Sequence, residues 1–186
     1  MIKQLSLITV IAFLGCQNSK NDNAKLSKIN PFDITKNETL PEVQSVNFKS
    51  IEDVTFKIQK ISSEGIKKLL QARFTENVSD YKNFTCFYFD IQCQDNIDIV
   101  KYSSENFRTL NERIQYLSFM IKDDITIRAN NKVYRCINST YDRTYGQIPY
   151  ARFFLVFEKI EDGDLLFQYN DYYFNKGLIN LKIQFQ

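Results

Sequence analysis

Few residues in this 186-residue chain are of a type that supports acid–base or nucleophilic chemistry. The chain has no histidine, which removes the commonest general base and metal ligand and excludes Ser-His-Asp and Cys-His catalysis. The remaining candidates are the carboxylates Asp90, Asp95, Asp123 and Asp124, which could act as acid and base only if they converged in a cleft. Acidic residues in strand-and-turn segments usually lie on solvated edges. We therefore expect no catalytic residue and no enzyme activity.

No segment has the spacing of a metal or cofactor site. Five glycines leave little room for a glycine-rich phosphate loop. The sequence Glu-Asp-Gly-Asp at 161–164 lacks the alternating oxygen ligands and the terminal glutamate of a calcium loop, so a solvated hairpin turn explains it better. We expect the protein to hold neither a cofactor nor a metal ion.

The cysteines leave two alternatives open. Cys86 and Cys93 lie in one expected strand, roughly 23 Å apart at about 3.3 Å per residue, which is far beyond the ~7 Å limit for a disulfide. Either of them could form a disulfide with Cys136, since export would permit one. Equally, all three could be small buried thiols.

The best candidate for a binding site is the tyrosine-rich segment 141–150. It places three tyrosines and an arginine between two expected strands, and these residue types are enriched at binding hot spots. The alternative is that the tyrosines cover the edge of the sheet and that the arginine pairs with a local carboxylate. A second aromatic group at 169–174 either lies beside this segment or belongs to the core. The predicted binding residues are Tyr141, Arg143, Tyr145 and Tyr150.

The first sixteen residues have the features of an export signal. Lys3 is followed by the mostly apolar segment 5–14, which is too short to cross a bilayer as a permanent helix but suits a signal peptide. The sequence Phe-Leu-Gly-Cys at 13–16 resembles the lipobox of bacterial lipoproteins, and the chain resembles the small, uncharacterised lipoproteins of Gram-negative bacteria. That resemblance implies cleavage before Cys16, lipidation of Cys16 with palmitate among its acyl chains, and an outer-membrane location. The domain would face the periplasm or the cell surface.

The expected organisation is a signal peptide at 1–15, a lipidated cysteine with a flexible tether at 16–46, and a β-sandwich domain at 47–186. The tether is polar and poor in large apolar residues; an arm packed on the domain is the alternative. The formal net charge of +2 falls to +1 when Lys3 is removed, so nothing indicates a nucleic-acid partner.

Local patterns predict most of the strands. Apolar and polar residues alternate at 54–59, and a serine-capped short helix follows near 62–70. The segment 83–93 is a strong strand whose expected core residues are Phe87, Phe89, Ile91 and Cys93.

The middle of the chain is ambiguous, because 107–121 fits both a helical apolar stripe and a buried strand. We favour a helical turn at 104–111 and a strand at 113–121. A hairpin turn is expected at 129–132. The turn at 161–164 should let 165–169 pair back onto 153–157, and the last strand should have one solvated face.

Several short strands separated by turns predict a mainly β fold, an antiparallel two-sheet sandwich that is immunoglobulin-like in the broad sense, with one or two short helices. The expected function is a non-enzymatic binding or structural role at the cell envelope. The partners would be the membrane, through the lipid anchor, and a protein or envelope component. The alternatives are an immunity-type lipoprotein that neutralises a toxin, a small-molecule carrier with an apolar cavity between its sheets and, least favoured, a carboxylate hydrolase.

Overall fold

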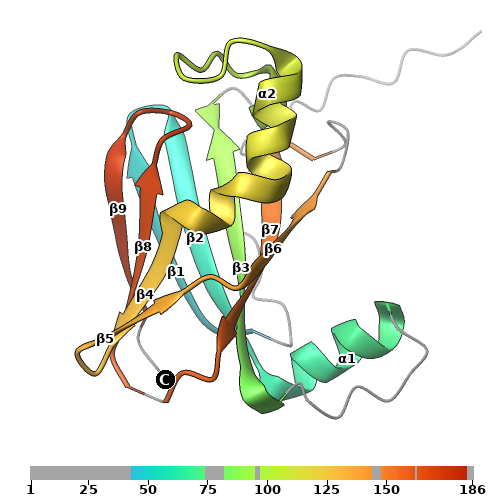
Figure 1. Cartoon of the computed structure of the whole chain (residues 1–186), viewed down its shortest axis with the longest axis vertical. Helices are drawn as coiled ribbons and strands as arrows, with labels where there is room; N and C mark the ends of the chain where they lie inside the picture. Colours follow the sequence, from blue (N-terminus) through green and yellow to red (C-terminus); the bar gives the residue numbers. More distant parts are fainter. Residues whose placement is uncertain (1–42, 74–81, 95–96, 144–147, 162, 184–186) are drawn as a thin grey trace, which may run out of the picture.

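The computed structural model describes residues 43–73, 82–94, 97–143, 148–161 and 163–183. Two antiparallel sheets pack face to face (Figure 1), which confirms the prediction of a mainly β, two-sheet sandwich. The first strand begins at Val43, earlier than the domain start expected at residue 47. In chain order the strands are β1 (Val43–Ile51), β2 (Val54–Ile61), β3 (Phe84–Cys93), β4 (Ile125–Ala129), β5 (Lys132–Arg135), β6 (Asn138–Asp142), β7 (Tyr150–Glu158), β8 (Leu165–Asp171) and β9 (Gly177–Ile183).

The larger sheet has the strand order β1-β2-β3-β7-β6, and the smaller sheet has the order β5-β4-β8-β9. Residues that alternate along each strand point between the sheets and form the main core. The predicted core residues Phe87, Phe89, Ile91 and Cys93 of β3 are all buried there. Phe89 joins the two sheets, since its ring lies 5.0 Å from the ring of Phe167 on β8.

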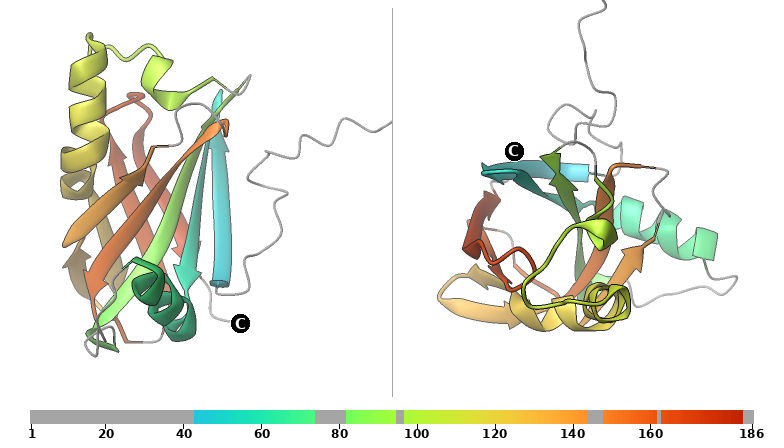
Figure 2. Two further views of the ribbon diagram at one scale, coloured as in Figure 1. Left: turned by 90° about the vertical axis from the view of Figure 1, so that its right-hand side faces the viewer. Right: turned by 90° about the horizontal axis from the view of Figure 1, so that it is seen from above.

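The other face of β3 is also buried. Helix α1 (Ser63–Arg73) lies on this outer face of the larger sheet (Figure 2). Its Ile66 belongs to a second apolar cluster with Ile61, Cys86 and Tyr88. The serine cap predicted for this helix is present, because the backbone N–H of Gly65 donates to the Ser62 hydroxyl at 3.0 Å.

The strand predicted at 113–121 is wrong, because the chain is helical there. Helix α2 (Leu110–Gln115) continues into the π-turn η4 (Tyr116–Met120) and the 3-10 turn η5 (Ile121–Asp124). A capping box starts the helix: Thr109 and Glu112 exchange side-chain and backbone hydrogen bonds at 2.8 and 3.2 Å. The helical stripe then buries Leu117 and Ile121 completely in the main core.

The pairing predicted between 165–169 and 153–157 is also wrong. Strand β7 is hydrogen-bonded to β3 and β6, so both of its edges are occupied. Strand β8 pairs with β4 and β9 in the other sheet, and the turn after β7 therefore crosses between sheets. The turn predicted at 129–132 does close a hairpin, with Asn130 and Asn131 at φ values of 49° and 61°.

The three described cysteines, Cys86, Cys93 and Cys136, are free and buried, so no disulfide joins them. Burial raises the pKa of each thiol to about 12. Cys16 lies outside the described residues. Within the described part of the chain, no helix combines the length and the apolar character needed to span a membrane.

Candidate functional site

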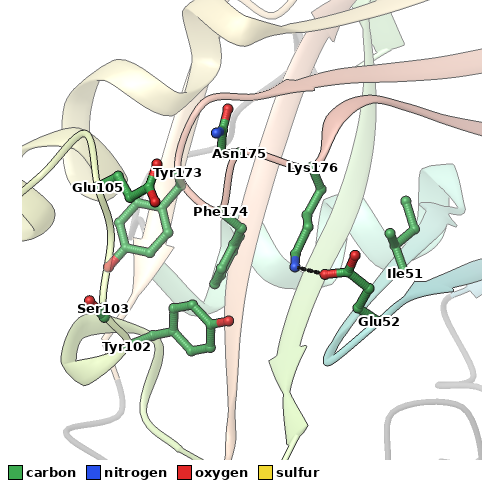
Figure 3. A pocket seen from close by; sticks show the side chains of 9 residues that line it. All are labelled: Ile51, Glu52, Tyr102, Ser103, Glu105, Tyr173, Phe174, Asn175 and Lys176. Carbon is green, nitrogen blue, oxygen red and sulfur yellow. Dashed lines mark hydrogen bonds and ion pairs between the residues drawn. The ribbon is translucent and has the colours of Figure 1, made fainter.

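One end of the sandwich carries a pocket of about 490 Å³. The β1–β2 turn, the segment after the 3-10 turn η3 (Ile99–Lys101) and the β8–β9 turn meet there (Figure 3). The strand register places the start of β7 at this same end, because Gln92 near the end of β3 pairs with Tyr150. The residues that line the pocket are Ile51, Glu52, Tyr102, Ser103, Glu105, Tyr173, Phe174, Asn175 and Lys176.

Aromatic rings form one wall of the pocket. The ring centroid of Phe174 lies 5.0 Å from that of Tyr102 and 4.8 Å from that of Tyr173, both near edge-to-face. The Tyr173 hydroxyl donates to the carbonyl of Ile99 at 2.8 Å. Tyr173 and Phe174 are buried, so this wall is held by the core behind it.

The buried carboxylate of Asp171, at the end of β8, shapes the loop that carries this wall. One oxygen accepts the backbone N–H groups of Tyr173 and Phe174 at 3.1 and 3.0 Å. The other oxygen accepts the N–H of Lys176 at 3.0 Å. Because Asp171 is only 3% exposed, it satisfies three backbone donors that would otherwise lack a partner away from water.

A network of charges occupies the opposite side of the pocket. The Lys176 ammonium donates to Glu52 and lies 3.2 Å from Asp53. The Tyr102 hydroxyl also donates to Asp53, and this bond lowers the pKa of that carboxyl and raises the pKa of Tyr102 to about 12. The hydrogen bond to Glu52 raises the pKa of Lys176, so the amine stays charged.

Glu105 stands on the side of the pocket away from Lys176, beside Tyr173 (Figure 3). Its side chain is exposed. Among the described residues it has no hydrogen bond or ion pair, in contrast to Glu52 and Asp53. The pocket therefore has a carboxylate on each side and aromatic rings between them.

The predicted binding segment is only partly exposed. Tyr141 is half-buried, and its ring stacks on Phe153 with the centroids 5.0 Å apart. Tyr141 also lines a second groove, of about 380 Å³, beside the 70% exposed Phe119. Arg143 is exposed. Tyr145 lies outside the described residues.

Tyr150 is half-buried beside an ion pair on the outer face of the larger sheet. Arg152 makes a bidentate ion pair with Asp90 at 2.7 and 2.8 Å, and its guanidinium lies 4.9 and 5.3 Å from the rings of Tyr88 and Tyr150. The register places Lys57 opposite Asp90. Burial alone would lower the pKa of Arg152, but the bonds to Asp90 outweigh it and raise that pKa.

The candidate carboxylates do not converge. Asp90 is on β3 and is bound by Arg152. Asp123 and Asp124 belong to η5, where Asp123 pairs with Lys122 at 2.6 Å and Asp124 accepts the Tyr116 hydroxyl at 2.7 Å. Asp95 lies outside the described residues. Within the described ranges, no group of three or more acidic or cysteine side chains is placed to hold a metal ion.

Comparisons with protein-family models, with curated proteins and with solved structures find no match to this chain. The site therefore has to be interpreted from its own geometry.

The sequence patterns missed the pocket because its residues come from three separate segments. Glu52 lies in a turn with φ of 51°, Tyr102 and Glu105 follow a 3-10 turn, and Lys176 lies in the last hairpin. The one local signal was the aromatic group at 169–174 next to an Asn-Lys-Gly turn. That group contributes Tyr173 and Phe174 both to the core and to the pocket wall.

Proposed function

We propose that this protein is an exported, lipid-anchored binding protein of the cell envelope with no enzyme activity, and that the pocket at the end of the sandwich engages its partner. The observation that carries the proposal is the construction of the pocket: loops on a rigid sandwich line it with rings held by the core and with charges held by ion pairs. Loops positioned in this way by a rigid scaffold commonly carry recognition.

The direction of the chain is compatible with an N-terminal anchor. Strand β1 begins at Val43 opposite Ile61, at the end of the sandwich away from the pocket, and reaches the pocket end at Ile51. Attachment through Cys16 would then leave the pocket end free to meet a partner. The lipobox-like sequence at 13–16 supports the anchor itself, and a multiply acylated cysteine would suffice for stable attachment.

The anchor and the binding site need separate tests. A metabolic palmitate label should be incorporated into the wild-type chain and lost in Cys16→Ala; labelling of both chains would contradict lipidation at Cys16. For binding, crosslinking in intact cells followed by affinity capture should recover an envelope component with the wild-type chain. Capture should fall with Phe174→Ser, which removes part of the wall.

The tyrosine-rich segment supplies the comparison for the binding test. Arg143→Ala should leave capture unchanged if the pocket is the binding site. Loss of capture with Arg143→Ala but not with Phe174→Ser would place the partner-binding site in the β6–β7 hairpin, which the sequence predicts. Far-ultraviolet circular dichroism of each variant would show that the fold is retained.

A further inference from the structure

We infer that the pocket binds a cationic group, an ammonium or a guanidinium such as a lysine or arginine side chain presents. This inference rests on the proposed function, since it names the chemistry of what the pocket recognises. It is drawn from the charges and rings around the pocket and from the way the chain already holds one cation there.

The balance of charge in the pocket is negative. Of the nine lining residues, Glu52 and Glu105 are acidic and Lys176 is the only cation. Asp53, the neighbour of Glu52 in the sequence, is bound to the same ammonium at 3.2 Å. These four groups carry three negative charges and one positive charge, so a second cation would be attracted and an anion repelled.

Lys176 shows what this pocket stabilises. Its side chain is only 14% exposed, and its ammonium is shared between Glu52 and Asp53. The chain thus already binds one ammonium against the pocket wall through two carboxylates. Because both of its ion pairs are made inside the chain, Lys176 is poorly placed to attract an anionic ligand.

The opposite side of the pocket offers a second position for a cation. Glu105 presents a carboxylate that has no partner among the described residues, and Tyr102 and Phe174 lie between it and Lys176 (Figure 3). Aromatic faces carry the negative part of the ring quadrupole and attract cations that come within about 6 Å. A carboxylate beside aromatic rings is the combination that recognises an ammonium or guanidinium.

The test is calorimetric titration of the full chain, in detergent, with four probes. Nα-acetyl-arginine methylamide and Nα-acetyl-lysine methylamide present the two cations, Nα-acetyl-citrulline methylamide is the neutral isostere of arginine, and Nα-acetyl-glutamate methylamide is the anion. We expect binding of one or both cationic probes, weakened by added salt, and no measurable binding of the neutral and anionic probes. Equal binding of the citrulline probe, or preference for the glutamate probe, would overturn the inference.

Two charge variants test whether the pocket attracts a positively charged ligand. Glu105→Gln should weaken binding of the cationic probe at least fivefold. Glu158→Gln, which neutralises an exposed carboxylate at the end of β7 away from the pocket, should leave binding unchanged. Lys176→Gln should strengthen binding severalfold, because it releases Glu52 and Asp53 for the ligand, and Lys182→Gln is its control. Weaker binding of the cationic probe to a folded Lys176→Gln chain would contradict the inference.

The outcomes separate this inference from the proposed function. Pocket-dependent capture of an envelope component together with no binding of either cationic probe would retain the function and reject the cationic ligand. Binding of the probes that depends on Glu105, together with capture that is insensitive to Phe174→Ser, would retain the cation site and reject the pocket as the place of partner binding.

Discussion

Replacing Arg152 by methionine should strongly destabilise the sandwich, because the substitution leaves the carboxylate of Asp90 buried without its main partner. Asp90 is completely buried, and both of its oxygens accept hydrogen bonds from the guanidinium, at 2.7 and 2.8 Å. Breaking a buried pair by removing one partner typically costs about 3–5 kcal/mol. Since Lys57 lies opposite Asp90 on β2, we expect a loss near the lower limit, about 3 kcal/mol.

Urea unfolding followed by circular dichroism would measure this loss. With a denaturant slope of about 2 kcal/mol per molar, a loss of about 3 kcal/mol lowers the urea midpoint by about 1.5 M. The matched control is Lys122→Met, which breaks the ion pair with Asp123. Those side chains are 33% and 68% exposed, and an exposed pair contributes only about 0–1 kcal/mol.

A second substitution separates the charge from the packing. Arg152 also lies against the rings of Tyr88 and Tyr150, so Arg152→Met removes ring contacts as well as the ion pair. Adding Asp90→Leu removes the buried charge but does not restore those contacts. Part of the lost stability should therefore return, because apolar replacements of buried ion pairs are often neutral, while Lys57 loses the carboxylate opposite it. A double variant as unstable as the sum of the two single variants, or an Arg152→Met chain as stable as the control, would refute this reasoning.

Three further outcomes follow from the same structure. The described thiols, whose pKa burial raises to about 12, should react slowly with Ellman's reagent at pH 8 in the folded protein and fast in guanidinium; fast reaction of the folded protein would contradict their burial. Tyr102→Phe should raise the pKa of Asp53 toward its usual value of 3.8. Because a lowered carboxyl pKa stabilises the fold above that value, the variant should melt below wild type at pH 7, and the difference should vanish as the pH falls toward 2. Asp171→Ala should lower the free energy of unfolding by at least about 2 kcal/mol, since three backbone N–H groups lose their acceptor; a loss below about 0.5 kcal/mol, within the range of ordinary surface substitutions, would argue against that role.

Strand positions could be predicted wherever the local pattern coincided with burial. Apolar and polar residues alternate at 54–59, and apolar residues are dense at 83–93. These two segments form β2 and β3. The strand predicted at 113–121 is wrong because the apolar residues of 107–121 fit both a helical and a strand period. The capping box of Thr109 and Glu112 is the local signal that favours the helix.

The candidate site was predictable only in part. Tyr141 and Tyr150 have large rings and were singled out for that reason, yet Tyr141 packs on Phe153 and Tyr150 on Arg152. In the sequence, the pocket residues Glu52, Glu105 and Lys176 do not differ from other charged residues of the protein surface. Nothing local marks such charges until distant segments bring them together.

The amino-acid sequence alone was enough to predict the β class, the turn at 129–132, the buried face of β3, and a chain without histidine chemistry. These properties depend on residue type and on the period of two along a strand. The lipid anchor at Cys16 also comes from the sequence and stays a prediction. Only the tertiary structure decided that β7 pairs with β3 and β6, and that the segments 51–52, 102–105 and 173–176 form one pocket. The physical reason is that alternation specifies which face of a strand is buried but not which strand lies beside it. That choice depends on long-range packing of the whole core.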